Sequence, residues 1–155
     1  MPRNGLSHDA LVLVCDGRKA LFLKNAGDAA FPKLETRGVM SQGDRPTHEL
    51  GTDKPGRSFS SAGQGRSAVE GTDFHELAEE AFLAKMAEEL GRLVTSEQVK
   101  AVVLVAPARA LGVLREKLPA AARKLVEAEF DKDYVKEPVY EIERHLTELF
   151  RKQKI

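Results

Sequence analysis

This 155-residue sequence has one cysteine, a formal net charge of zero and no long apolar run. Cys15 is the only cysteine, which excludes an internal disulfide and a four-cysteine zinc site; within its apolar run we expect it to be a buried strand thiol. The 24 basic and 24 acidic residues cancel, which excludes binding to nucleic acid through bulk positive charge but allows a local basic patch. The longest apolar run, Ala10–Cys15, is far shorter than the roughly 18 residues of a membrane helix.

The same run is too short for the core of a signal peptide, and no small-residue cleavage site follows it. We therefore expect a cytoplasmic protein with no membrane partner. The remaining composition, with 42% hydrophobic and 31% charged residues, is typical of a soluble globular chain. Its length predicts a single domain that spans residues 1–155.

The first third of the chain has the pattern of three strands. The run that ends at Cys15 is followed by Asp16-Gly17, a dipeptide typical of tight hairpin turns. A second apolar strand is expected over 19–25 and a weaker third strand over 34–40. A period of two would place Leu34 and Met40 of that third strand on the same face. The pattern predicts a three-stranded antiparallel meander.

Residues 43–71 differ from the rest of the chain because they hold six of the twelve glycines and almost no large apolar residue. Such a segment buries too little to offset its ordering entropy, so we expect a mobile, glycine-rich loop. Its arginines, serines and glycine amides precede a helix N-terminus, an arrangement that suits phosphate or RNA. The candidate contacts are Arg57, Ser58, Gly63, Gly65 and Arg66. The alternative is that residues 43–71 form a solvent-exposed, disordered loop with no binding partner.

The second half alternates between helices and strands. Asp73 and Glu76 have the spacing of a capping box at the start of a helix that ends near 91–95. The apolar stretch 100–107 is typical of a central parallel strand, and a helix over 108–118 follows it. A fifth strand that alternates Val126 and Ala128, and a last helix from Pro138, complete the order βββαβαβα. We expect a three-layer α/β fold, a mixed five-stranded sheet with helices on both faces.

Familiar catalytic and cofactor motifs are missing. The four histidines are far apart in the sequence, and His75 lacks the second histidine of a zinc-protease motif, so we predict no metal site. A two-metal nuclease would need carboxylates at Asp16, at Glu79 or Glu80, and after the fourth strand, where the chain has none. Asp16 is therefore interpreted as a turn residue. The serines lie outside a nucleophile elbow, the glycines fit no nucleotide motif, and no cofactor is expected.

Three stretches nevertheless resemble a known family. Asp53-Lys54-Pro55-Gly56-Arg57-Ser58-Phe59, Ala106-Pro107-Ala108-Arg109-Ala110-Leu111-Gly112 and Asp131-Lys132-Asp133 are similar to the bacterial "protein required for attachment to host cells" family. The resemblance extends over roughly residues 10–149. That family in turn looks like a relative of the catalytic domain of archaeal and eukaryotic class I peptide-chain release factors. The resemblance implies a ribonuclease-H-like fold.

In those release factors a loop between the third strand and the first long helix carries Gly-Gly-Gln, whose glutamine helps to position water at the peptidyl-tRNA ester. The corresponding segment here is Ala62-Gly63-Gln64-Gly65, in which alanine replaces the first glycine. The resemblance thus implies Gln64 as the candidate catalytic residue. A chain of 155 residues has no room for the codon-reading domain, so we do not expect an autonomous stop-codon reader.

Three functions remain open. The first is a module without established catalysis that contacts the ribosome, tRNA or another RNA through the 43–71 loop. The second is an interaction protein that influences bacterial attachment to host cells as a component of that pathway. The third is a peptidyl-tRNA ester hydrolase that uses Gln64.

Overall fold

The computed structural model describes residues 5–43, 71–97 and 99–153. The bounds of its elements are β1 Leu11–Cys15, β2 Lys19–Asn25, β3 Leu34–Ser41, α2 Gly71–Ser96, β4 Val102–Ala106, α3 Ala108–Lys117, α4 Ala120–Arg123, β5 Val126–Asp131 and α5 Val139–Gln153. This is the order expected from the sequence, with the short α4 added after Pro119. The glycine-rich stretch falls almost wholly outside the described residues.

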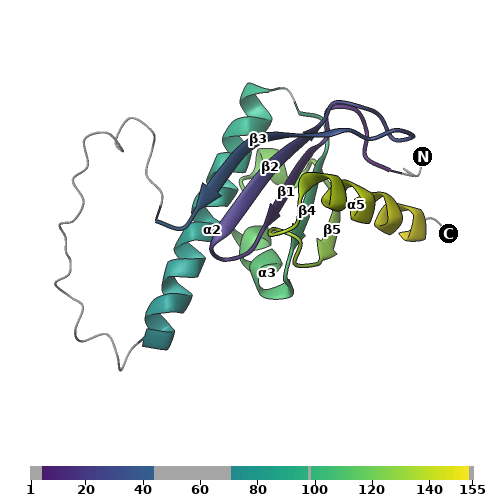
Figure 1. Cartoon of the computed structure of the whole chain (residues 1–155). Helices are drawn as coiled ribbons and strands as arrows, with labels where there is room; N and C mark the ends of the chain where they lie inside the picture. The colour runs from purple at the N-terminus through teal and green to yellow at the C-terminus, as the bar shows by residue number, and fades with distance from the viewer. Residues whose placement is uncertain (1–4, 44–70, 98, 154–155) are drawn as a thin grey trace, which may run out of the picture.

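The five strands form one sheet in the order β3-β2-β1-β4-β5. β1, β2 and β3 pair antiparallel as a meander, whereas β4 pairs parallel with both β1 and β5. Figure 1 shows α2 and α3 on one side of this sheet and α5 on the other. The expected α/β class, a mixed five-stranded sheet with helices on both faces, is confirmed.

The two central strands explain the three layers. Every residue of β1 and β4 is buried, so both faces of the sheet need a cover. Along β1 the side chains alternate: Leu11 and Leu13 pack toward α2, α3 and α4, and Val12 and Val14 pack toward α5. Cys15 is buried with the first group, as expected, and burial raises the pKa of its thiol to about 12.

A β-bulge in β3 corrects one expectation from the sequence. The register between β2 and β3 shifts between Phe22 and Leu23, which makes Arg37 an extra residue of β3. Because one added residue reverses the inward and outward alternation, Leu34 packs on the α5 side and Met40 on the α2 side. The prediction that these two residues share a face is therefore wrong.

A second register shift reverses the alternation of side chains in β5. It lies between Val102 and Val103 of β4, and makes Glu127 the extra residue of β5. Val126 consequently packs against the α2-side core, whereas Ala128 belongs to the α5-side core. The strand itself is where the sequence predicted it.

Helix α2 begins two residues before the expected cap. Its first residue is Gly71, which places Asp73 and Glu76 within its first two turns rather than at a capping box. Among the described residues no helix is both long enough and apolar enough to span a membrane.

Candidate functional site

The residues proposed from the sequence as contacts or catalyst lie outside the described part of the chain. They are Arg57, Ser58, Gly63, Gln64, Gly65 and Arg66. The structure describes what flanks them: β3 and Gly43 on one side, and helix α2 from Gly71 on the other. Figure 1 shows the first turns of α2 extending beyond the sheet, where Phe74 is 61% exposed and Leu77 is 64% exposed.

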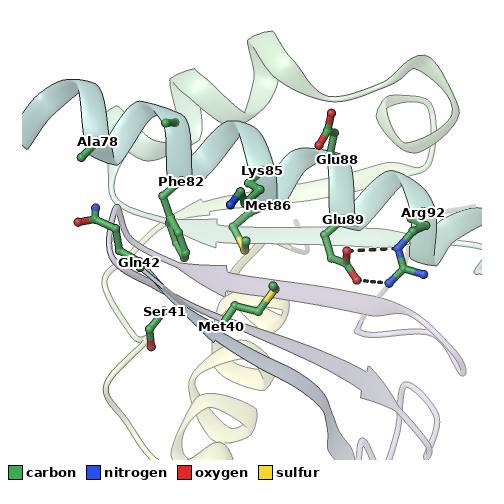
Figure 2. Close-up of a pocket in the computed structure, with 12 residues that line it drawn as sticks. Met40, Ser41, Gln42, Ala78, Phe82, Lys85, Met86, Glu88, Glu89 and Arg92 are labelled. Atoms are coloured by element: carbon green, nitrogen blue, oxygen red, sulfur yellow. Dashed lines mark hydrogen bonds and ion pairs between the residues drawn. The ribbon is translucent and has the colours of Figure 1, made fainter. Parts of the chain in front are cut away.

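A groove lies between the end of β3 and the middle of α2; we call it the β3–α2 groove. Its volume is about 810 Å³. Its lining residues are Met40, Ser41, Gln42, Gly43, Ala78, Ala81, Phe82, Lys85, Met86, Glu88, Glu89 and Arg92. Figure 2 shows Met40 of β3 facing Phe82 and Met86 of α2, and these three side chains make an apolar floor.

The charges of the groove lie on its rim. Arg92 donates two hydrogen bonds to the Glu89 carboxylate, and this bonding raises the pKa of the guanidinium. Lys85 is exposed and makes no hydrogen bond or ion pair with any described residue. Figure 2 shows Glu88 pointing away from the sheet. Among its described lining residues, the groove therefore offers one unpaired ammonium group, that of Lys85, beside an apolar floor.

A second, smaller cavity of about 250 Å³ lies where β1 and β4 end; we call it the β1–β4 cleft. The chain turns back to β2 after β1 but continues through α3 to β5 after β4, and ligands of open α/β sheets bind at such a divergence. The lining residues are Asp16, Gly17, Arg18, Glu76, Glu79, Glu80, Leu83, Pro107, Arg109, Ala110 and Val113.

Three of the four carboxylates that line this cleft have partners among the described residues; Glu80 is the exception. Asp16 accepts hydrogen bonds from the backbone N–H groups of Arg18 and Lys19 at 2.8 and 2.9 Å, so its role as a turn residue is confirmed. Arg18 also lies 3.7 Å from Glu79. A Cβ at Gly17 would lie 2.8 Å from the Glu79 side chain, so a larger residue there would displace that side chain. Arg109 lies 3.4 Å from Glu76, so two ion pairs between described residues line the cleft.

The sequence analysis missed one cluster of possible ligands. Glu137, Glu141 and His145 place a carboxylate or ring atom each within 4.8 Å of one another. His145 Nε2 lies 2.8 Å from Glu137, its ring stacks on Tyr134, and Arg144 bonds Glu141 at 2.6 Å. The four-residue spacing of Glu141 and His145 on a helix is the signal that a comparison of histidines alone overlooks.

Two of three comparisons with known proteins found a similarity. The computed structure is similar to the crystal structure of an archaeal translation termination factor, aRF1, with a TM-score of 0.46 and 15% sequence identity. The alignment covers 93% of this chain but 37% of that one. No curated protein matches the sequence. The family model described as "Protein required for attachment to host cells" matches residues 11–146, and this chain belongs to that family.

Proposed function

We propose that this protein is a binding module that contacts the ribosome, tRNA or another RNA through residues 43–71. The support from the sequence is chemical. Arg57, Arg66 and Ser58 are donors suited to phosphate oxygens, and Gly63 and Gly65 have no side chain that could shield their backbone amides. In this proposal the function is binding and needs no catalytic step.

One structural observation carries the proposal further. The segment leads directly into the first turns of α2, which extend beyond the sheet and expose Phe74 and Leu77. RNA-binding surfaces combine basic groups with exposed aromatic rings on which bases stack. Phe74 also contacts the His75 ring, with centroids 6.3 Å apart. In this proposal the cations and amides of residues 43–71 act together with the exposed Phe74 ring.

Family membership favours a second function. The family is described as required for attachment to host cells, so we propose as the alternative an interaction protein whose partner is a component of that pathway. The two proposals differ in the partner, which is RNA in the first and protein in the second.

Co-sedimentation with ribosomes tests the first proposal. Arg57→Glu combined with Arg66→Glu is expected to lower the bound fraction by at least about tenfold, because two phosphate contacts become repulsions. Lys100→Glu combined with Lys136→Glu changes net charge by the same amount at exposed positions elsewhere and should leave binding unchanged. Equal binding by both double variants would exclude residues 43–71 as the contact.

Pull-down from lysate with and without ribonuclease separates the two partners. Capture that ribonuclease abolishes supports RNA, and capture that survives it supports a protein component of attachment. The hydrolase function implied by Gln64 has its own assay. Turnover of peptidyl-tRNA that Gln64→Ala abolishes would replace binding by catalysis as the function of this segment.

A further inference from the structure

The sheet ends at β3 with an edge that no described strand covers. Such an edge presents a row of backbone N–H and C=O groups, which is a template for a further strand. The bulge at Arg37 divides this edge, because the Arg37 side chain bonds Glu97 at 2.9 Å and the strand alternation reverses there. The regular part of the edge is the last stretch, Gly38–Ser41.

This stretch borders the β3–α2 groove. Met40, Ser41 and Gln42 line the groove from the strand, and α2 lines it from the other side. A strand edge beside a helix, with an apolar channel between them, is the geometry in which a domain accepts an extended peptide as an added strand. Backbone hydrogen bonds supply general affinity there, and the channel selects the side chain.

The floor specifies an apolar side chain. Met40 and Met86 are flexible and polarizable, so they adapt to side chains of different shape, and Phe82 gives a rigid wall. A volume of about 810 Å³ exceeds one large side chain, which leaves space for two on the same face of a strand.

The rim specifies charge. The Glu89 carboxylate is bonded to Arg92, Glu88 points away from the sheet, and Lys85 has no described partner. An acidic residue beside the apolar anchor would meet the Lys85 ammonium, whereas a basic residue would be repelled. Charge complementarity thus favours an acidic peptide.

From these observations we propose that the β3–α2 groove binds an extended segment of a partner protein as a sixth strand next to Gly38–Ser41. An apolar residue of the segment enters the Met40–Phe82–Met86 floor, and a neighbouring acidic residue pairs with Lys85. The proposal concerns a surface of described residues and does not rest on the RNA contact.

The test starts from random heptapeptides displayed on phage and selected on the full chain. Enriched peptides are expected to carry an apolar residue with Asp or Glu within two positions. A synthetic copy of an enriched peptide is then measured by fluorescence anisotropy. N-methylation of its backbone amides should abolish binding, because an added strand must donate hydrogen bonds. Amide exchange should slow within Gly38–Ser41 when the peptide binds.

Three variants locate the peptide. Met40→Glu, at a half-buried position, should weaken binding by at least about tenfold because it charges the floor. Lys85→Glu should weaken binding of the acidic peptide about fivefold. A peptide in which lysine replaces the acidic residue should bind this variant as tightly as the acidic peptide binds the parent. Lys136→Glu, at an exposed position that does not line the groove, should leave binding unchanged. Thermal unfolding verifies that each variant is folded.

Several results would overturn the proposal. These are a selection that enriches no peptide, an enriched peptide that binds Met40→Glu as tightly as the parent, and an N-methylated peptide that still binds. A dimer in light scattering that Met40→Glu dissociates would instead assign the edge to a second copy of this chain.

Discussion

Ion pairs of Glu97 connect the end of α2 to β2 and β3. It directly follows α2, and its carboxylate accepts a hydrogen bond from Lys24 of β2 at 3.3 Å and from Arg37 of β3 at 2.9 Å. The side chain is 22% exposed. The bond from Arg37, more than that from Lys24, lowers the pKa of the carboxyl, although burial opposes the shift. The extra residue of the β3 bulge is thus anchored to the end of α2.

This lowered pKa has a definite sign for stability. A carboxyl that binds protons more weakly in the folded state stabilises the fold above its unfolded pKa of about 4.5, and this stabilisation is lost as the pH falls through the folded value. Glu97→Gln should lower the free energy of unfolding by up to about 1 kcal/mol at pH 7. It should also make that free energy depend less on pH between pH 5 and 3. Urea unfolding across that range measures it.

Glu148→Gln is the matched control, because Glu148 forms an exposed ion pair with Arg151 within α5. Its acid dependence should match that of the parent. An unchanged slope for Glu97→Gln would contradict the role assigned to the three-residue cluster.

At the scale of elements, the packing of α2 against the segment after α3 depends on a glycine. Gly91 is buried in α2, and a Cβ at this position would lie 2.6 Å from Cγ of Pro119. Gly112 of α3 is exposed, and a Cβ there would meet nothing within 4 Å. The two glycines share a helical setting but differ in their neighbours.

Alanine substitutions at these positions should have opposite effects. Gly91→Ala gains helix propensity but pushes α2 away from Pro119, so we expect a net loss of about 1–3 kcal/mol. Gly112→Ala gains propensity without a clash and should stabilise the protein by up to about 1 kcal/mol. Urea unfolding of both variants checks this pair. Stabilisation by Gly91→Ala would contradict this expectation, because it would show that α2 and Pro119 can move apart at little cost in free energy.

The elements were largely predictable because each leaves a local signal. Strands and helices follow from apolar periodicity, and Asp16-Gly17 from turn chemistry. The faces of β3 and β5 were not predictable, since a bulge adds one residue without changing composition. The β3–α2 groove was also missed, because it joins Met40 to Met86 across a long stretch of sequence. The candidate contacts at 43–71 remain predictions.

At the scale of the whole molecule, we expect the scaffold to fold without the proposed contact segment. The described residues alone form a continuous sheet and two buried cores. Replacement of residues 44–70 by a Gly/Ser linker of the same length keeps the loop-closure entropy nearly constant. The free energy of unfolding should therefore change by about 1 kcal/mol or less, while co-sedimentation with ribosomes is lost. Loss of the folded sheet would contradict this separation.

The sheet topology also sets an order for biosynthesis. β1 pairs with β2 across a tight turn, but its other neighbour, β4, is translated about ninety residues later. Until then β1, a wholly apolar strand, forms an open edge of the nascent meander. An open apolar edge can pair with other chains and aggregate. We therefore expect this chain to need a chaperone more during synthesis than after it has folded.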